Sequence, residues 1–340
     1  MQKKDVLFVL SIDTEEEWLW DEEFPQDDCS VKNITKLPEF NEFCKSLGIR
    51  PTYFVDYAVA QDELGQKVLS QFASEKSAEI GAHLHPWCNP PFFGKTREAE
   101  SHVINLPKEQ VEQKLDALTD LIHRNIGVRP KSFRSGRWGI DGNTLELLAS
   151  RGFSVDSSIY PFYQNDFFSC LGAPTVPYWP SFTDALLRGN QRTLAEIPIT
   201  AGFSVSRFNT AEKIHGALSK PPFSWFKMVG ALWHTKLLRK IYLSPELTNS
   251  ANMNTLVDTC LKNNHQVIHM YLHSSSLIDG ATGLLDVDEA CERIKSRIAA
   301  VIKHLGKQRN IKFCTISEAA IALKNVSYSC ASDCSPEVLL

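Results

Sequence analysis

Eight short apolar runs recur along this chain of 340 residues, and segments with helical periodicity separate several of them. The runs are rich in branched residues and too short for ordinary helices, so they indicate buried strands. Between two of them, a single apolar stripe follows Pro107, a residue that helices tolerate at their start. This alternation predicts an α/β protein with a parallel sheet, and seven or eight such units can close into a barrel. The runs cover residues 6–12, 51–55, 79–84, 131–135, 153–157, 194–199, 266–272 and 311–316.

The rhythm breaks once, at residues 202–250, where an aromatic and basic segment replaces the regular alternation. We find no internal repeat and no flexible linker that would separate two cores. The sequence therefore predicts one domain over residues 1–325, with residues 202–250 as an insertion and residues 326–340 as a loose tail.

Ionisable side chains of the kind that bind metals stand at the ends of two apolar runs. Asp13 and Glu15 follow the first run, and His83 and His85 follow the third. Alternate residues of a strand share a face, so each pair points in one direction. Because the carboxyl ends of parallel strands meet at one edge, we expect two carboxylates and two imidazoles to converge there on a metal ion.

Composition excludes several classes of protein. A net charge of -4 without a dense basic face argues against a nucleic-acid partner. The nine cysteines lack CxxC spacing and fit reduced thiols. The first strand starts too early for a secretion signal, and no run reaches the roughly 20 apolar residues that span a bilayer. These features predict a cytoplasmic protein.

Three further runs complete a recognisable set. They begin at Ser132, Ser154 and Met270, and they read SFRSGRWG, SVDSS and MYLHS. In order and approximate spacing, the five runs resemble the polysaccharide deacetylase family, the carbohydrate esterases that share the chitooligosaccharide deacetylase homology domain. The resemblance covers about residues 5 to 320. It implies a distorted β/α barrel that removes acetyl groups from sugars with the help of a divalent metal.

The resemblance also implies a role for each motif residue. Asp13 matches the catalytic base, and Glu15 matches the metal-binding carboxylate. His83 matches the first metal histidine, and Arg134 matches the arginine that orients the base. His273 matches the general acid, for which an ordinary imidazole pKa near neutrality is suited.

The chain departs from the family pattern at two positions. The family commonly places its second metal histidine where this chain has Trp87, and its metal carboxylate is usually an aspartate. Two histidines that face one side of a strand can still chelate, so we expect His85 to be the second ligand and zinc to be the ion. Glu16 is the alternative to Glu15.

Aromatic rings stack on the apolar faces of sugars, and aromatic residues crowd these motifs. We expect Trp87, Trp138 and Tyr160 to contact a carbohydrate, together with Arg137 of the SFRSGRWG run. Lysines and arginines interleave with large apolar residues over 219–243. That segment suits either peripheral contact with an anionic membrane, and so a lipid-linked sugar, or a lid packed over the barrel.

These observations favour a metal-dependent deacetylase of an N-acetylated sugar in a glycan or glycan precursor. Two alternatives stay open. One is a hydrolase with the same fold that attacks a non-sugar C–N bond, as the allantoinase-like relatives of the family do. The other is a carbohydrate-binding pseudoenzyme, which the altered histidine spacing would explain.

Overall fold

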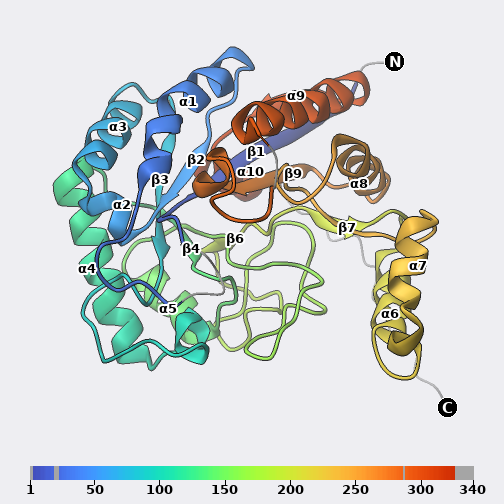
Figure 1. Cartoon of the computed structure of the whole chain (residues 1–340), viewed down its shortest axis with the longest axis horizontal. Coiled ribbons are helices and arrows are strands. Elements are labelled where there is room, and N and C mark those ends of the chain that lie inside the picture. The colour runs from blue at the N-terminus through green and yellow to red at the C-terminus, as the bar shows by residue number, and fades with distance from the viewer. Residues whose placement is uncertain (1–2, 19–22, 286–287, 326–340) are drawn as a thin grey trace.

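The computed structural model describes residues 3–18, 23–285 and 288–325, so the predicted tail lies outside the described residues. The described chain forms a parallel sheet curled into a half-barrel, with helices around its outer side (Figure 1). This confirms the predicted distorted β/α barrel. Each strand of this sheet overlaps one of the eight apolar runs. The strands are β1 (Asp5–Thr14), β2 (Thr52–Val55), β3 (Glu79–Leu84), β4 (Ser132–Ser135), β5 (Val155–Asp156), β6 (Ala195–Glu196), β9 (Val267–His273) and β10 (Asn310–Phe313).

Strand β1 is the centre of the sheet. One of its edges pairs with β9 from Leu7 to Asp13, and its other edge pairs first with β10 and then with β2. The order continues from β2 through β3, β4 and β5 to β6, and every pairing in this sheet is parallel. The carboxyl ends of the strands therefore lie at one end of the barrel. On the far side of β9, the backbone N–H of Thr200 donates to the carbonyl of His269 at 2.9 Å, which partly closes the gap after β6.

The helices begin and end at residues that their sequences indicate. Aspartate or asparagine side chains cap four of them, since Asp56, Asp62, Asp141 and Asn249 each accept a backbone N–H of the first turn. Gly127, at φ 83°, ends the helix whose apolar stripe follows Pro107. The helices around the sheet are α1 (Leu37–Ser46), α2 (Tyr57–Gln61), α3 (Glu63–Ser74), α4 (Lys108–Ile126), α5 (Gly142–Ser150), α8 (Ser250–Lys262), α9 (Ala290–Gln308) and α10 (Ile316–Asn325), and short 3-10 turns are η1 (Lys32–Lys36), η2 (Ala99–Ser101), η3 (Val103–Asn105) and η5 (Ser274–Leu277).

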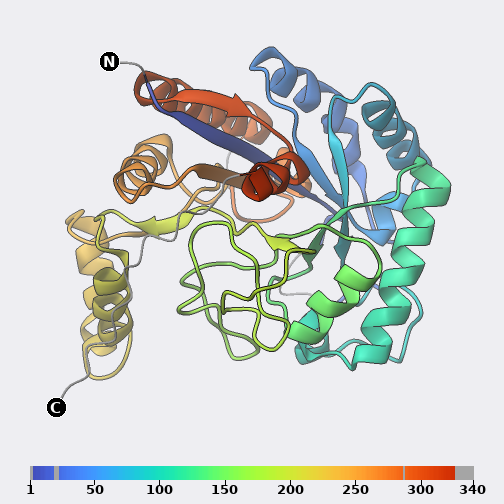
Figure 2. The same ribbon diagram turned by 180° about the vertical axis from the view of Figure 1, so that it is seen from behind.

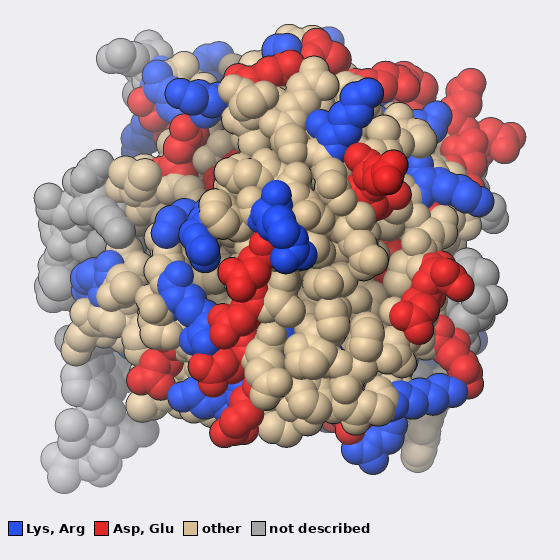
Figure 3. Space-filling view, turned by 90° about the vertical axis from the view of Figure 1, so that its left-hand side faces the viewer, with Lys and Arg blue, Asp and Glu red and all other residues tan. Residues whose placement is uncertain are grey.

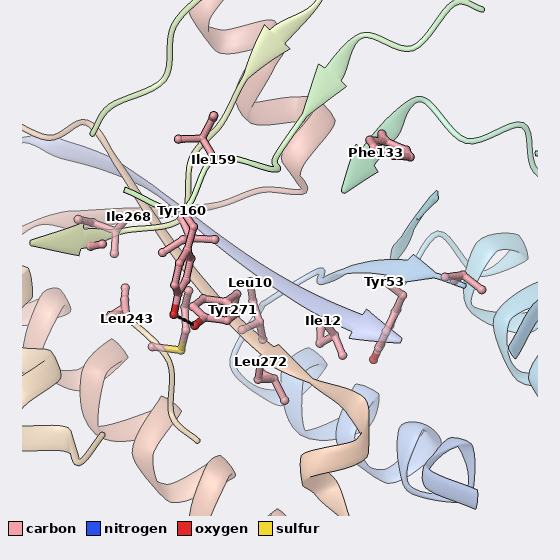
Figure 4. Close-up of a cluster of buried hydrophobic side chains, with 14 of the residues drawn as sticks. Leu10, Ile12, Tyr53, Phe133, Ile159, Tyr160, Leu243, Ile268, Tyr271 and Leu272 are labelled. Carbon is pink, nitrogen blue, oxygen red and sulfur yellow. Dashed lines mark hydrogen bonds between the residues drawn. The ribbon is translucent and has the colours of Figure 1, made fainter. Parts of the chain in front are cut away.

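The two faces of β1 have different roles. Leu10 and Ile12 belong to the large apolar cluster that also contains Tyr53 and Leu272 (Figure 4). On the other face, Val9 packs in a second apolar cluster with residues of α10. Ser11 and Asp13 follow Val9 on that inner face, so the barrel interior changes from apolar to ionisable toward the carboxyl ends of the strands.

Residues 204–239 form a separate feature that we call the arm. It joins β7 (Ala201–Phe203) to β8 (Lys240–Tyr242), which pair with each other in an antiparallel ladder. The arm contains α6 (Phe208–Leu218), η4 (Phe223–Phe226) and α7 (Met228–His234). Both ribbon views show α6 and α7 at the outer edge of the molecule, beyond α8 and away from the strands of the half-barrel (Figures 1 and 2).

Candidate active site

A cavity of about 280 Å³ opens at the carboxyl ends of β1, β3, β4 and β9. Asp13, His83 and His273 line it from the strands, and Glu15 and His85 line it from the residues that directly follow β1 and β3. The remaining walls are mainly aromatic. They include Trp18, Trp87, His102, Ser135, Arg137, Trp138, Tyr160, Tyr163, Asn165 and Tyr271.

Glu15, His83 and His85 converge as the sequence predicted. Oε2 of Glu15 lies 3.3 Å from Nε2 of His83 and 3.2 Å from Nε2 of His85. The two Nε2 atoms are 3.0 Å apart. A tetrahedral cation with bonds of about 2.0–2.1 Å holds its ligand atoms roughly 3.3 Å from one another, so this triangle has the size of a zinc site.

The hydrogen bonds behind both imidazoles support a cation at that point. Nδ1 of His83 lies 3.0 Å from the carbonyl of Arg134, and a carbonyl can only accept. Nδ1 of His85 lies 3.0 Å from a carboxylate oxygen of Glu16. Both rings therefore carry a proton on Nδ1, which in a neutral imidazole leaves a lone pair on Nε2. Two lone pairs and a carboxylate oxygen then face one another, and a positive charge between them is what relieves their repulsion.

Glu16, Trp87, Asp56 and Cys88 form a buried layer behind His85. The indole Nε1 of Trp87 donates to Oε1 of Glu16 at 2.6 Å, and its ring stacks on His85 with centroids 4.2 Å apart. Glu16 thus binds His85 through one oxygen and Trp87 through the other. Trp87 stands where the family has its second histidine, and here it positions the carboxylate that orients His85. Glu16 lies behind the ligand triangle, whereas Glu15 is part of it.

The electrostatics of this centre favour a cation. Burial penalises the charge of Glu15, but the positive charge of His273 and the adjacent imidazoles of His83 and His85 outweigh it and hold the pKa of Glu15 well below its usual value. Burial likewise opposes a charge on His85, but Glu16 and Glu15 outweigh it and raise the pKa of His85. The carboxylates are thus ionised, and the space between them attracts a proton or a metal ion.

Arg134 is fully buried and holds Asp13 in place. Its Nη1 lies 2.5 Å from Oδ1 of Asp13, while its Nε donates to the carbonyl of Ser157 at 3.0 Å. Its Nη2 donates at 2.9 Å to the hydroxyl of Ser11 and to that of Ser157. With these contacts the guanidinium has a fixed orientation, and Oδ2 of Asp13 is left directed toward His273.

His273 lies beside Asp13 because β1 and β9 pair these two residues directly. Its Nε2 is 3.8 Å from Oδ2 of Asp13, and its Nδ1 is 2.7 Å from Oε1 of Glu246. Burial opposes the charge of His273, but Glu246, Glu15 and Asp13 outweigh it and raise the pKa to about 10. The pKa near neutrality that the sequence suggested is therefore wrong for this protein, because three carboxylates surround the ring. His273 carries its proton at neutral pH.

The predicted carbohydrate contacts all line the cavity. Trp138 stacks on Tyr160 with ring centroids 4.6 Å apart, and the hydroxyls of Tyr160 and Tyr271 are 2.7 Å apart, as the dashed line in Figure 4 marks. Arg137 and Trp138 have φ angles of 59° and 63°, a conformation that residues other than glycine seldom adopt. Strained backbone of this kind is common at functional sites, and here it belongs to the loop that brings both side chains to the cavity wall.

Sequence reasoning missed two groups that complete the site. Glu246 comes from the loop after β8 within the insertion, 27 residues before His273, and nothing in its local sequence marks it. Asp56 caps α2 by accepting the N–H of Val59 at 2.8 Å, and its other oxygen accepts the N–H of Glu16 at 3.3 Å. Its position after an apolar run was a signal for a strand end, but it did not distinguish a helix cap from a site residue.

The fold and the cavity together define a deacetylase-type β/α barrel with a buried carboxylate–imidazole pair beside a candidate metal centre. No family model matches the chain, and no curated protein matches its sequence. Solved structures match its fold. A proposed polysaccharide deacetylase from Mycobacterium smegmatis matches with a TM-score of 0.56 and 14% identity, over 100% of this chain and 95% of that one. A proposed glycoside hydrolase/deacetylase from Parabacteroides distasonis matches with a TM-score of 0.60 and 11% identity, over 95% of this chain and 72% of that one. The fold is that of the polysaccharide deacetylases, as the sequence resemblance implied.

Proposed function

We propose that this protein is a metal-dependent hydrolase that removes an acetyl or related acyl group from an N-acetylated sugar of a glycan or glycan precursor. One divalent cation, zinc, would be held by Glu15, His83 and His85. The convergence of a carboxylate oxygen with two imidazole nitrogens at 3.0–3.3 Å carries the proposal. The Nδ1 atom of each imidazole is hydrogen-bonded to another group, so the Nε2 atoms are the ones that face the proposed ion.

A cation held there polarises the acyl carbonyl and makes water a better nucleophile. Asp13 accepts the proton of the attacking water through Oδ2, the oxygen that Arg134 leaves unbound. Arg134 keeps the Asp13 carboxylate aligned and charged. His273 donates the proton of its Nε2 to the departing sugar nitrogen, and Glu246 compensates the charge of the imidazolium before that transfer.

The aromatic wall supports a sugar as the substrate. Trp138 and Trp18 offer flat apolar surfaces beside the proposed centre, and Arg137 adds a hydrogen-bond donor. The intact set of acid, base and ligands favours an enzyme over a carbohydrate-binding pseudoenzyme. The non-sugar amide hydrolase shares this acid–base set, so the choice between the two enzymes depends on the substrate.

Two measurements test the proposal. Metal content after dialysis should be one divalent ion per chain in the unmodified protein, and it should be lost in His83→Ala but kept in His123→Ala, an exposed histidine of α4. Mass spectrometry of acetylated sugars and of nucleotide- or lipid-linked precursors, incubated with zinc-loaded protein, should show loss of an acetyl group. Retained metal in a folded His83→Ala variant overturns the ligand assignment. Metal binding without any acetyl release points to the non-sugar hydrolase.

No helix within the described residues has both the length and the apolar character needed to cross a bilayer. The cytoplasmic location stays a prediction from the sequence.

A further inference from the structure

The charge of the chain is unevenly distributed, and the arm is positively charged on an otherwise negative chain. Residues 204–239 contain six cations (Arg207, Lys213, Lys220, Lys227, Lys236 and Arg239) and one acid, Glu212, for a net charge of +5. The whole chain has a net charge of -4, so the remaining residues carry -9. The side of the molecule at the left of Figure 1, far from the arm, instead mixes acidic and basic side chains (Figure 3).

The arm also exposes large apolar side chains. Trp225 and Phe226 of η4 are 74% and 72% exposed, and Leu237 is 65% exposed. Helix α7 has an apolar sequence from Met228 to Trp233 but buries none of its residues. Leu232 of α7 packs, partly buried, against the apolar core, whereas Trp233 and the aromatic residues of η4 stay exposed. Large exposed apolar side chains grouped in one segment are typical of interaction sites.

The arm is anchored at its base and leaves the cavity uncovered. Phe208 and Ala211 of α6 are buried, and Phe208 packs against Phe162 and Phe203. At the C-terminal residue of the arm, also at its base, Arg239 hydrogen-bonds Asn252 of α8. Among the described residues that line the cavity, none belongs to the arm. The alternative of a lid over the barrel therefore has no support from contacts.

We propose that the arm docks on an anionic lipid bilayer, with Trp225, Phe226 and Leu237 entering the interface and the neighbouring lysines facing the headgroups. A basic segment with exposed tryptophan and phenylalanine has the composition of interfacial membrane anchors. Its charge of +5 on an otherwise acidic molecule complements an anionic surface and orients the approach. Docking on a bilayer is separate from the proposed deacetylase chemistry, and it is tested by measuring lipid binding rather than turnover.

The experiment measures binding of the full chain to vesicles. Vesicles of equal parts phosphatidylglycerol and phosphatidylcholine should bind the protein at low ionic strength and release it as salt is added. Vesicles of phosphatidylcholine alone should bind it weakly. Changing Lys220→Glu, Lys227→Glu and Lys236→Glu together should weaken partition by roughly a hundredfold. The matched control, Lys67→Glu with Lys303→Glu and Lys307→Glu, changes three exposed lysines outside the arm and should keep binding within a few-fold of the unmodified protein.

The apolar half of the proposal has its own variants. The double variant Trp225→Ser with Phe226→Ser should abolish binding. The control is Phe92→Ser with Phe93→Ser, which changes two neighbouring exposed aromatic residues outside the arm and should keep binding. Brominated lipids should quench tryptophan fluorescence in the folded protein, and the conservative Trp225→Phe variant should lose most of that quenching.

Three results would overturn the proposal. The first is no binding to anionic vesicles at low ionic strength. The second is equal loss of binding in the arm variants and in their controls. The third is self-association of the protein without lipid that the Trp225→Ser and Phe226→Ser variant removes, because a second copy of the chain would then be the partner of the arm.

Discussion

His273 and Glu246 form a buried pair in which Nδ1 of the imidazole lies 2.7 Å from Oε1 of the carboxylate. The second oxygen of Glu246 accepts the backbone N–H of His273 at 3.1 Å, so one carboxylate fixes both the ring and the strand end that bears it. The pair resembles the acid–base arrangements in which a carboxylate selects the tautomer of a histidine and stabilises its charged form.

The first prediction concerns the pH dependence of turnover. A general acid must be protonated, so activity falls as pH rises through the pKa of His273, which Glu246 helps to raise to about 10. Glu246→Gln keeps an acceptor for Nδ1 but removes the negative charge. The alkaline limb of kcat/KM should therefore move to lower pH, although a cation on Glu15 would offset part of the raised pKa in both proteins. Glu109→Gln, an exposed carboxylate of α4, gives the control profile. An alkaline limb that stays in place contradicts the role of Glu246.

The second prediction concerns Asp13. Asp13→Asn removes the proton acceptor and should lower kcat by on the order of 10²- to 10⁴-fold, while metal content stays unchanged. Because Arg134 is fully buried, loss of its negative partner should also lower the thermal midpoint. Asp62→Asn, which preserves an N-cap on α3, should change neither property. Near-normal turnover of a folded Asp13→Asn variant would transfer the base to another group.

Much of the fold could be predicted because its causes are local. Strand-length apolar runs and helical stripes follow from residue spacing, and each of the eight runs overlaps a strand of the sheet. The meeting of Asp13 with His273 and of His83 with Arg134 follows from one rule, that parallel strands end at a common edge. The register confirms it, since both pairs are direct neighbours in the sheet.

The rest of the site depends on long-range packing that no local pattern encodes. Glu246 reaches His273 from a loop inside the insertion, and Asp56 reaches Glu16 from a helix cap. The pKa of His273 could not be predicted for the same reason, since Glu246, the carboxylate that raises it most, comes from that loop. The exposure of the arm also requires the structure, because an amphipathic sequence suits a lid and a membrane anchor equally.

The third prediction concerns the close approach of Gly136 to His85. A Cβ atom built on Gly136 would lie 2.3 Å from Cδ2 of His85 and 2.5 Å from the carbonyl of Leu84. Gly136→Ala should therefore displace the imidazole and weaken metal affinity by on the order of 10- to 100-fold, the usual effect of disturbing a ligand's support. Titration of the metal-free protein with zinc and a chromophoric competitor measures this directly. Gly216→Ala, with open space around its Cβ, is the control. Unchanged affinity in Gly136→Ala would remove His85 from the ligand set.

The last prediction concerns stability and a buried acid pair that is not among the residues lining the cavity. Asp156 and Glu196 are direct neighbours on β5 and β6, and their side chains are fully buried. Burial, together with the charge of Asp156, raises the pKa of Glu196 well above its usual value. Glu196 is therefore protonated in the folded protein at pH values where the unfolded chain has lost that proton.

The sign of the effect follows from linkage. A carboxyl group whose pKa is raised in the folded state makes its full contribution to the free energy of unfolding below its unfolded-state pKa of roughly 4.3. That contribution falls as pH rises toward the folded-state pKa. Between these two pKa values, the wild type loses about 1.4 kcal/mol of unfolding free energy per pH unit. Glu196→Gln imitates the protonated acid and titrates in neither state, so its thermal midpoint relative to the wild type should increase from pH 5 to pH 8. Glu109→Gln should show no such trend. A constant difference between Glu196→Gln and the wild type across this range would mean that Glu196 is already ionised in the folded protein.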